Sequence, residues 1–157
     1  MQGRVLVIAG SDSGGGAGIQ ADIKTVTALG GYAMTAITAL TAQDTRGVAG
    51  IHDVPPDFVA AQARVVLADI GADCVKIGML HTPDVIEVVA VVLKAEASGI
   101  PVVLDPVMVA KGGARLLQAD AVERLRETLL PRATVLTPNI PEAEALAGRS
   151  IRDRGDM

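Results

Sequence analysis

Aromatic side chains are nearly absent from this chain, which has no tryptophan, one tyrosine and one phenylalanine in 157 residues. Because 50% of the residues are nonetheless hydrophobic, the sequence predicts one compact domain with a core of Val, Leu, Ile, Ala and Met. There is one cysteine, Cys74, which excludes an intrachain disulfide framework and favours a reducing compartment. We therefore expect a cytoplasmic protein.

Positive charge and long apolar runs are also scarce. The formal net charge is −4 and no basic run is present, so we expect neither nucleic acid nor an anionic membrane surface as a partner. The longest apolar stretch, 85–93, contains Glu87 and is too short to span a bilayer. The N-terminus enters a strand without a signal-peptide pattern, which again favours the cytoplasm.

Strands and helices alternate along the chain. Apolar runs predict strands at 4–9, 32–42, 48–54 (a short edge strand), 74–77, 102–104 and 135–137. Glycine and proline boundaries predict helices at 17–29, 55–69, 82–98, 120–130 and 141–147, and 150–157 resembles the start of another element. This alternation predicts an α/β fold with a mostly parallel sheet covered by helices on both faces.

Polar and glycine residues follow most of the predicted strands at their carboxyl ends. They are the glycine-rich segment 10–18, Gln43 with Asp44, Gly78 with Met79, Asp105, and Asn139. Because ligands of such folds bind outside the carboxyl ends of the strands, the sequence predicts a site at this rim.

The glycine-rich segment is the strongest local signal. Such a turn between strand and helix brings the backbone close to a ligand and directs free amides at it. Counted from Gly10, the phosphate-loop pattern fails because Gly16 stands where lysine is required. The dinucleotide-binding pattern Gly-x-Gly-x-x-Gly, counted from Gly14, fails because Ile19 occupies the position of the third glycine. A flexible tight turn is the alternative.

Asp22 and the pair Asn139 and Glu142 each have two interpretations. Asp22 shares a predicted helix face with Ile19, Ile23, Val26 and Leu29, so it needs either a neighbouring polar partner or a ligand. Asn139 and Glu142 have capping-box spacing, which we favour from spacing alone, but could also orient Mg²⁺-bound water and phosphate. Lys76 lies in an apolar strand and predicts a salt bridge.

Five collinear segments resemble the hydroxymethylpyrimidine/phosphomethylpyrimidine kinases of thiamine synthesis, in the ribokinase-like superfamily. The segments are AGSDSGGGAGIQADIKT (9–25), TALTAQDT (38–45), KIGML (76–80), VLDPVM (103–108) and TPNIPEAE (137–144). The resemblance covers essentially the whole chain. It implies a ribokinase-like three-layer α/β/α fold, and a homodimer.

The resemblance further implies an ATP- and Mg²⁺-dependent kinase. It would phosphorylate 4-amino-5-hydroxymethyl-2-methylpyrimidine and then the resulting monophosphate. By similarity the pyrimidine pocket is lined by Asp22, Gln43 (glutamate in some members), Met79, Gly10, Ala17, Thr41 and Val107. Asp105, Asn139 and Glu142 match positions that organise the nucleotide phosphates, with Asp105 and Glu142 as metal ligands. Without an Arg/Lys cluster, the phosphates are expected to rely on metal and backbone amides.

In its C-terminal half, the family carries a Gly-Thr-Gly motif followed by the residue assigned as general base, and this sequence contains no such motif. We therefore expect residues 1–157 to be the N-terminal portion of one kinase domain, with no catalytic residue of its own and little turnover in isolation. The alternatives are a pyridoxal or pyridoxine kinase and a catalytically dead pyrimidine-binding module. A dinucleotide-binding oxidoreductase half is a more distant alternative.

Overall fold

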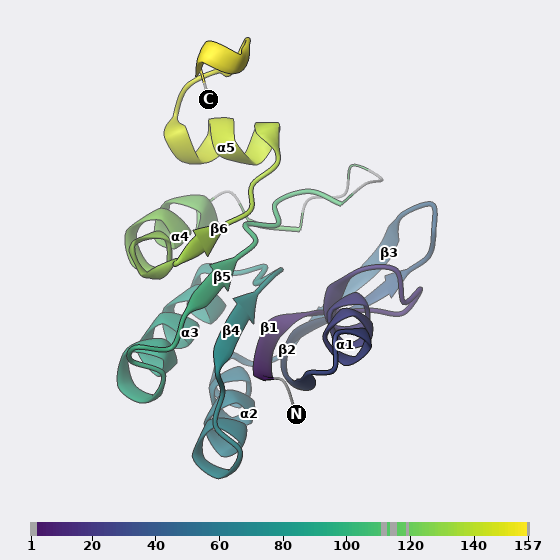
Figure 1. Cartoon of the computed structure of the whole chain (residues 1–157). Helices are drawn as coiled ribbons and strands as arrows, with labels where there is room; N and C mark the ends of the chain where they lie inside the picture. The colour runs from purple at the N-terminus through teal and green to yellow at the C-terminus, as the bar shows by residue number, and fades with distance from the viewer. Residues whose placement is uncertain (1–2, 111–112, 114–115, 119, 157) are drawn as a thin grey trace.

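The computed structural model describes residues 3–110, 113, 116–118 and 120–156. The strands are β1 (Arg4–Asp12), β2 (Tyr32–Gln43), β3 (Val48–Asp53), β4 (Cys74–Ile77), β5 (Val102–Leu104) and β6 (Val135–Leu136). The helices are α1 (Gly18–Ala28), α2 (Pro56–Asp69), α3 (Pro83–Glu96), α4 (Ala121–Thr128) and α5 (Ile140–Ala147), with 3-10 turns at Leu130–Arg132 and Arg154–Asp156. Figure 1 shows α5 and the C-terminal turn projecting beyond the body of the sheet.

The strands form one sheet in the order β3-β2-β1-β4-β5-β6. All neighbouring pairs are parallel except β2 with β3, which places the antiparallel β3 at the edge as the sequence predicted. The predicted α/β fold with a mostly parallel sheet is confirmed.

One face of the sheet carries the main core. Leu6 and Ile8 of β1 and Val75 and Ile77 of β4 are fully buried there with Leu104 of β5. Helices α2, α3 and α4 pack over them and against one another. Since side chains alternate along a strand, the intervening residues face the opposite layer.

The opposite face is covered by α1, which packs on β1 and β2. Ile19 is buried there against Val7 and Ala9. The predicted apolar face of this helix is wrong in its extent, because Ile23 is 37% and Leu29 is 71% exposed. The helix packs mainly on β1 and β2, so these apolar side chains stay largely outside the core.

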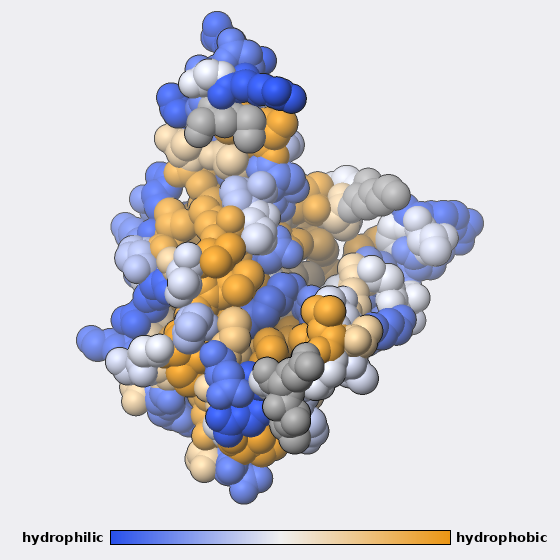
Figure 2. All heavy atoms as spheres, viewed as in Figure 1, coloured by the Kyte–Doolittle hydropathy of each residue, from blue (hydrophilic) through white to orange (hydrophobic). Residues whose placement is uncertain are grey.

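The same face stays partly open over β4 to β6. Lys76, Val103 and Val135 stand in register across these strands, and Val135 is 48% exposed. Hydrophobic residues show at the surface in this part of the molecule (Figure 2). Within the described residues, no helix is long and apolar enough to cross a membrane.

Candidate functional site

The glycine-rich loop between β1 and α1 is organised by Asp12. This side chain is 5% exposed. Its Oδ1 accepts a hydrogen bond from the Gly14 amide at 2.8 Å, and its Oδ2 accepts from the amides of Gly16 at 2.9 Å and Ala17 at 2.8 Å. The Gly15 amide donates to the Asp12 carbonyl at 3.0 Å.

These contacts correct the expectation that the loop directs free amides at a ligand. The amides of 14–17 turn inward instead, because a buried carboxylate requires donors and the loop is its nearest source. Asp12 is evident in the sequence, but nothing in its spacing predicts that its carboxylate would accept hydrogen bonds from the amides of its own loop.

Gly18 allows the backbone of the loop to lie close to the backbone of β1. Its φ is +54°, and a Cβ placed on it would lie 2.4 Å from the carbonyl oxygen of Gly10. Gly10 is confined as well, since a Cβ there would lie 3.1 Å from Sδ of Met79. Glycine at both positions lets the start of α1 lie directly against the end of β1.

Beside this junction is a cavity of about 380 Å³. It opens at the carboxyl ends of β1, β2, β4 and β5. All seven residues that the resemblance assigned to a pyrimidine pocket line it, namely Gly10, Ala17, Asp22, Thr41, Gln43, Met79 and Val107. Lys76 and Asp105 also line it, whereas Asn139 and Glu142 do not.

Apolar side chains form one wall of the cavity. Met79 is 7% exposed and clusters with Ala39 and Leu116, with Val107 packed against them. The buried hydroxyl of Thr38 donates to the Met79 carbonyl at 2.7 Å, which fixes the backbone after β4. Such a wall suits the face of a flat, uncharged ring. Thr38 is a positioning residue that sequence reasoning missed.

Polar groups from the end of β2 also line the cavity. The Thr41 hydroxyl is 2.9 Å from the Ser11 carbonyl and 3.1 Å from Oε1 of Gln43. Ser13 Oγ donates to the Gln43 carbonyl and accepts from the Gln43 amide, both at 2.8 Å. These bonds hold the Gln43 carboxamide at the cavity, where it offers both a donor and an acceptor.

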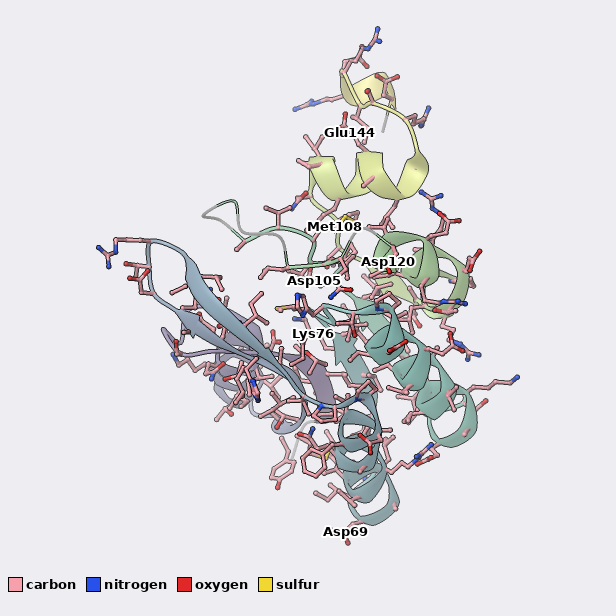
Figure 3. All side chains as sticks on the ribbon, turned by 180° about the vertical axis from the view of Figure 1, so that it is seen from behind. Asp69, Lys76, Asp105, Met108, Asp120 and Glu144 are labelled. Carbon is pink, nitrogen blue, oxygen red and sulfur yellow. The ribbon has the colours of Figure 1, made fainter. Side chains whose placement is uncertain are left out.

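Lys76 connects the remaining charged residues. Its Nζ lies 2.9 Å from Oδ2 of Asp22 and 3.9 Å from Oδ2 of Asp105. The predicted salt bridge of Lys76 is therefore present, and it supplies the polar partner that Asp22 requires on its helix face. Figure 3 shows Lys76 and Asp105 side by side near the strand ends, while Asp69 lies at the far end of α2.

The electrostatics of Asp105 follow from this crowding. Burial is the largest cause that raises the pKa of its carboxyl, Glu142 and Asp22 raise it further, and Lys76 lowers it. Thr137 forms a hydrogen bond with the carboxylate, which also lowers the pKa. The net upward shift means that the ionised carboxylate is held in the folded protein at a cost in stability.

Replacement of Asp105 by asparagine is therefore expected to raise the thermal unfolding midpoint slightly at pH 7, by about 2 °C or less because the side chain is partly exposed. With a raised folded pKa, the favourable contribution of Asp105 exists at acid pH, below its unfolded pKa, and is lost as pH rises through its folded pKa. The advantage of Asp105→Asn should thus shrink as pH falls towards about 4. Thermal melts of both proteins across this range test it, and lower stability of the variant at pH 7 would contradict it.

Asn139 and Glu142 form a complete capping box at the start of α5. Oδ1 of Asn139 accepts from the Glu142 amide and Oε2 of Glu142 accepts from the Asn139 amide, both at 3.0 Å. Oε1 of Glu142 accepts from the Met108 amide at 3.3 Å. The capping interpretation is thus confirmed, and Glu142, 6% exposed, also ties α5 to the segment after β5.

A preformed metal cage is not part of this site. Among the described residues, no group of three His, Cys, Asp or Glu side chains is placed to hold a metal ion. The surplus negative charge around Asp105 nevertheless fits a divalent cation, and Mg²⁺ commonly keeps several waters and takes only one or two carboxylates.

Comparisons with known proteins show which family the chain resembles in sequence. A model of the phosphomethylpyrimidine kinase family matches residues 12–157. The thiamine biosynthesis bifunctional protein ThiED of Geobacter sulfurreducens is 58% identical over 156 residues, which are 99% of this chain and 32% of that protein. The hydroxymethylpyrimidine/phosphomethylpyrimidine kinase of Haemophilus influenzae is 55% identical over 150 residues, which are 96% of this chain and 55% of that protein.

Solved structures show the same likeness. The phosphomethylpyrimidine kinase from Clostridium difficile 630 superposes with a TM-score of 0.90 at 46% identity, covering 98% of this chain and 66% of that one. A pyridoxal kinase from Staphylococcus aureus, in complex with AMP-PCP and pyridoxal, gives a TM-score of 0.84 at 37% identity, covering 98% and 54%. The ribokinase-like fold is confirmed, and the chain spans about half the length of the hydroxymethylpyrimidine/phosphomethylpyrimidine kinases it matches.

Proposed function

The chain belongs to the phosphomethylpyrimidine kinase family, and on that premise we propose that it carries the pyrimidine-binding part of an ATP-dependent kinase of thiamine synthesis. The substrates are 4-amino-5-hydroxymethyl-2-methylpyrimidine and its monophosphate. The observation that carries this proposal is the cavity at the strand ends, which is lined by apolar side chains together with a carboxylate and a carboxamide.

The proposed pocket matches the substrate group by group. Met79 and Val107 contact the face of the pyrimidine ring. Asp22 accepts a hydrogen bond from the amino group, and Gln43 pairs with the ring edge as both donor and acceptor. Gly10, Ala17 and Thr41 keep the walls close enough to exclude water from the ring.

The nucleotide phosphates are proposed to lie on the side of Asp105. Phosphoryl transfer depends mainly on positioning and on neutralisation of charge. Mg²⁺, when bound, supplies positive charge to the phosphates. Asp105 would hold this ion directly, and Glu142 would act through water because both of its oxygens already accept backbone amides.

We further propose that residues 1–157 form the N-terminal portion of a single kinase domain. The partly open face over β4 to β6 and the share of the relatives that is matched support this division. The general base and most of the nucleotide site are then contributed from outside this chain, so the isolated 157-residue chain binds the pyrimidine with little or no turnover.

A pyridoxal kinase is the alternative, since the Staphylococcus aureus structure is similar. The higher identities to the pyrimidine kinases favour the pyrimidine. The test is steady-state phosphorylation by the protein at its natural length, with each substrate alone and in competition. The proposal predicts a higher kcat/KM for hydroxymethylpyrimidine, and a clear preference for pyridoxal would contradict it.

Loss of the Asp22 carboxylate should weaken pyrimidine binding. Asp22→Ala is expected to cost about 1–3 kcal/mol of binding free energy, because polar groups of ligand and pocket lose their partner. Calorimetric titration measures it, with Asp69→Ala as the control because Asp69 is exposed at the end of α2. Equal affinities for the wild type and Asp22→Ala would leave Asp22 as only the salt-bridge partner of Lys76.

A further inference from the structure

The cavity is rich in negative charge and poor in positive charge. Asp12, Asp22 and Asp105 line it, and among its described lining residues Lys76 is the sole cation. A phosphorylated ligand that enters this space therefore meets carboxylates on several sides. Such a ligand requires positive charge or free donors close to its phosphate.

The glycine-rich loop is poorly suited to supply those donors. The amides of 14–17 are bound to Asp12. Their release would leave the Asp12 carboxylate buried without partners, which is costly. We therefore expect a phosphate beside the ring to be recognised by side chains.

Lys76 stands between the proposed ring side and the proposed phosphate side of the cavity. Its side chain rises from β4 between Val7 of β1 and Val103 of β5, on the face that is open beyond α1. Nζ contacts Asp22 on the proposed ring side and approaches Asp105 on the proposed phosphate side, at 2.9 and 3.9 Å. The ammonium group has three donors, and the longer contact to Asp105 is loose enough to be exchanged.

We propose that Lys76 is the residue that recognises the phosphate of the monophosphate substrate. The neutral hydroxymethyl substrate leaves Lys76 paired with the two aspartates. The monophosphate accepts a charge-assisted hydrogen bond from Nζ, which keeps its bond to Asp22 and gives up the contact to Asp105. This inference rests on the proposed function and deepens it, because it assigns the phosphorylated substrate its own recognition residue.

The experiment compares two ligands on four proteins at natural length. Calorimetric dissociation constants are measured for hydroxymethylpyrimidine and for its monophosphate, without nucleotide or Mg²⁺. The proteins are the wild type, Lys76→Met, Lys76→Arg, and Lys94→Met as a control that removes an exposed charge from α3. Any effect of an unpaired Asp22 acts on both ligands, so the ratio of the two constants isolates the phosphate.

Lys76→Met is expected to raise the dissociation constant of the monophosphate about tenfold or more beyond its effect on that of hydroxymethylpyrimidine. Lys76→Arg should keep the ratio of the two constants within about threefold of the wild type, because it retains the positive charge. Lys94→Met should do the same, because Lys94 lies far from the cavity. Equal weakening of both ligands by Lys76→Met, or unchanged binding of the monophosphate, would overturn the inference while the proposed function stands. A wild type that binds neither pyrimidine contradicts the proposed function as well. Lys76→Gln replaces Lys76→Met if the latter does not fold.

Discussion

Gly18→Ala should lower the free energy of unfolding by about 2–4 kcal/mol and abolish tight binding of the pyrimidine. The added Cβ would lie 2.4 Å from the Gly10 carbonyl oxygen and 3.2 Å from the Asp12 amide, both of which are backbone atoms without freedom to rotate away. The left-handed φ of +54° adds conformational strain for alanine. Since Gly10, Ala17 and Gly18 all line the cavity, relief of this clash must move its wall.

A neighbouring glycine provides the matched control. Gly16 is exposed, and a Cβ there would have its nearest contact 3.9 Å away, at Oδ2 of Asp12. Gly16→Ala should leave stability unchanged or slightly raised, and should leave binding unchanged. Urea unfolding and calorimetric titration of both variants measure the effects. Similar stability and affinity for Gly18→Ala and Gly16→Ala would show that the close approach of loop and strand is unimportant.

Removal of the Asp12 carboxylate should have an effect of similar size. Asp12→Ala leaves the amides of Gly14, Gly16 and Ala17 without their acceptor, at an expected cost of about 3 kcal/mol in the free energy of unfolding. Asp12→Asn keeps one acceptor oxygen but turns an NH₂ group towards a backbone amide. It should therefore fall between the wild type and Asp12→Ala.

Urea unfolding and pyrimidine titration of both Asp12 variants measure this order, with Asp69→Ala again as the exposed control. Affinity should fall in the same order as stability, because the loop that Asp12 shapes forms part of the cavity wall. If Asp12→Ala were as stable as the control variant, the loop would be held by something other than this carboxylate.

The element order could be predicted because each strand is an apolar run bounded by glycine or proline. The predicted ends of the strands are less accurate where strand pairing extends beyond the apolar residues. β1 was expected to end at Ala9, but it continues through a bulge, and Ser11 and Asp12 pair with Leu40 and Thr41 of β2. Their polar side chains hide this extension from a hydrophobicity pattern. The expected element at 150–157 amounts to the turn Arg154–Asp156, and residue 157 lies outside the described residues.

The rim could be predicted because the carboxyl ends of parallel strands meet there. The partners of the charged residues could not, because they depend on side chains that lie far apart in the sequence. Lys76 of β4 reaches Asp22 of helix α1, and Glu142 of α5 reaches the Met108 amide beyond the end of β5. The charge of Lys76 inside an apolar strand predicts a salt bridge, but it does not identify the partner.

The most direct measurement is a crystal structure of the protein at its natural length with hydroxymethylpyrimidine and a non-hydrolysable ATP analogue. We expect the ring to lie against Met79, with its amino edge on Asp22 and Gln43, and the terminal phosphate of the nucleotide to lie on the Asp105 side of Lys76. A pyrimidine ring bound away from this cavity, or a nucleotide bound on the Gln43 side, would contradict this expectation.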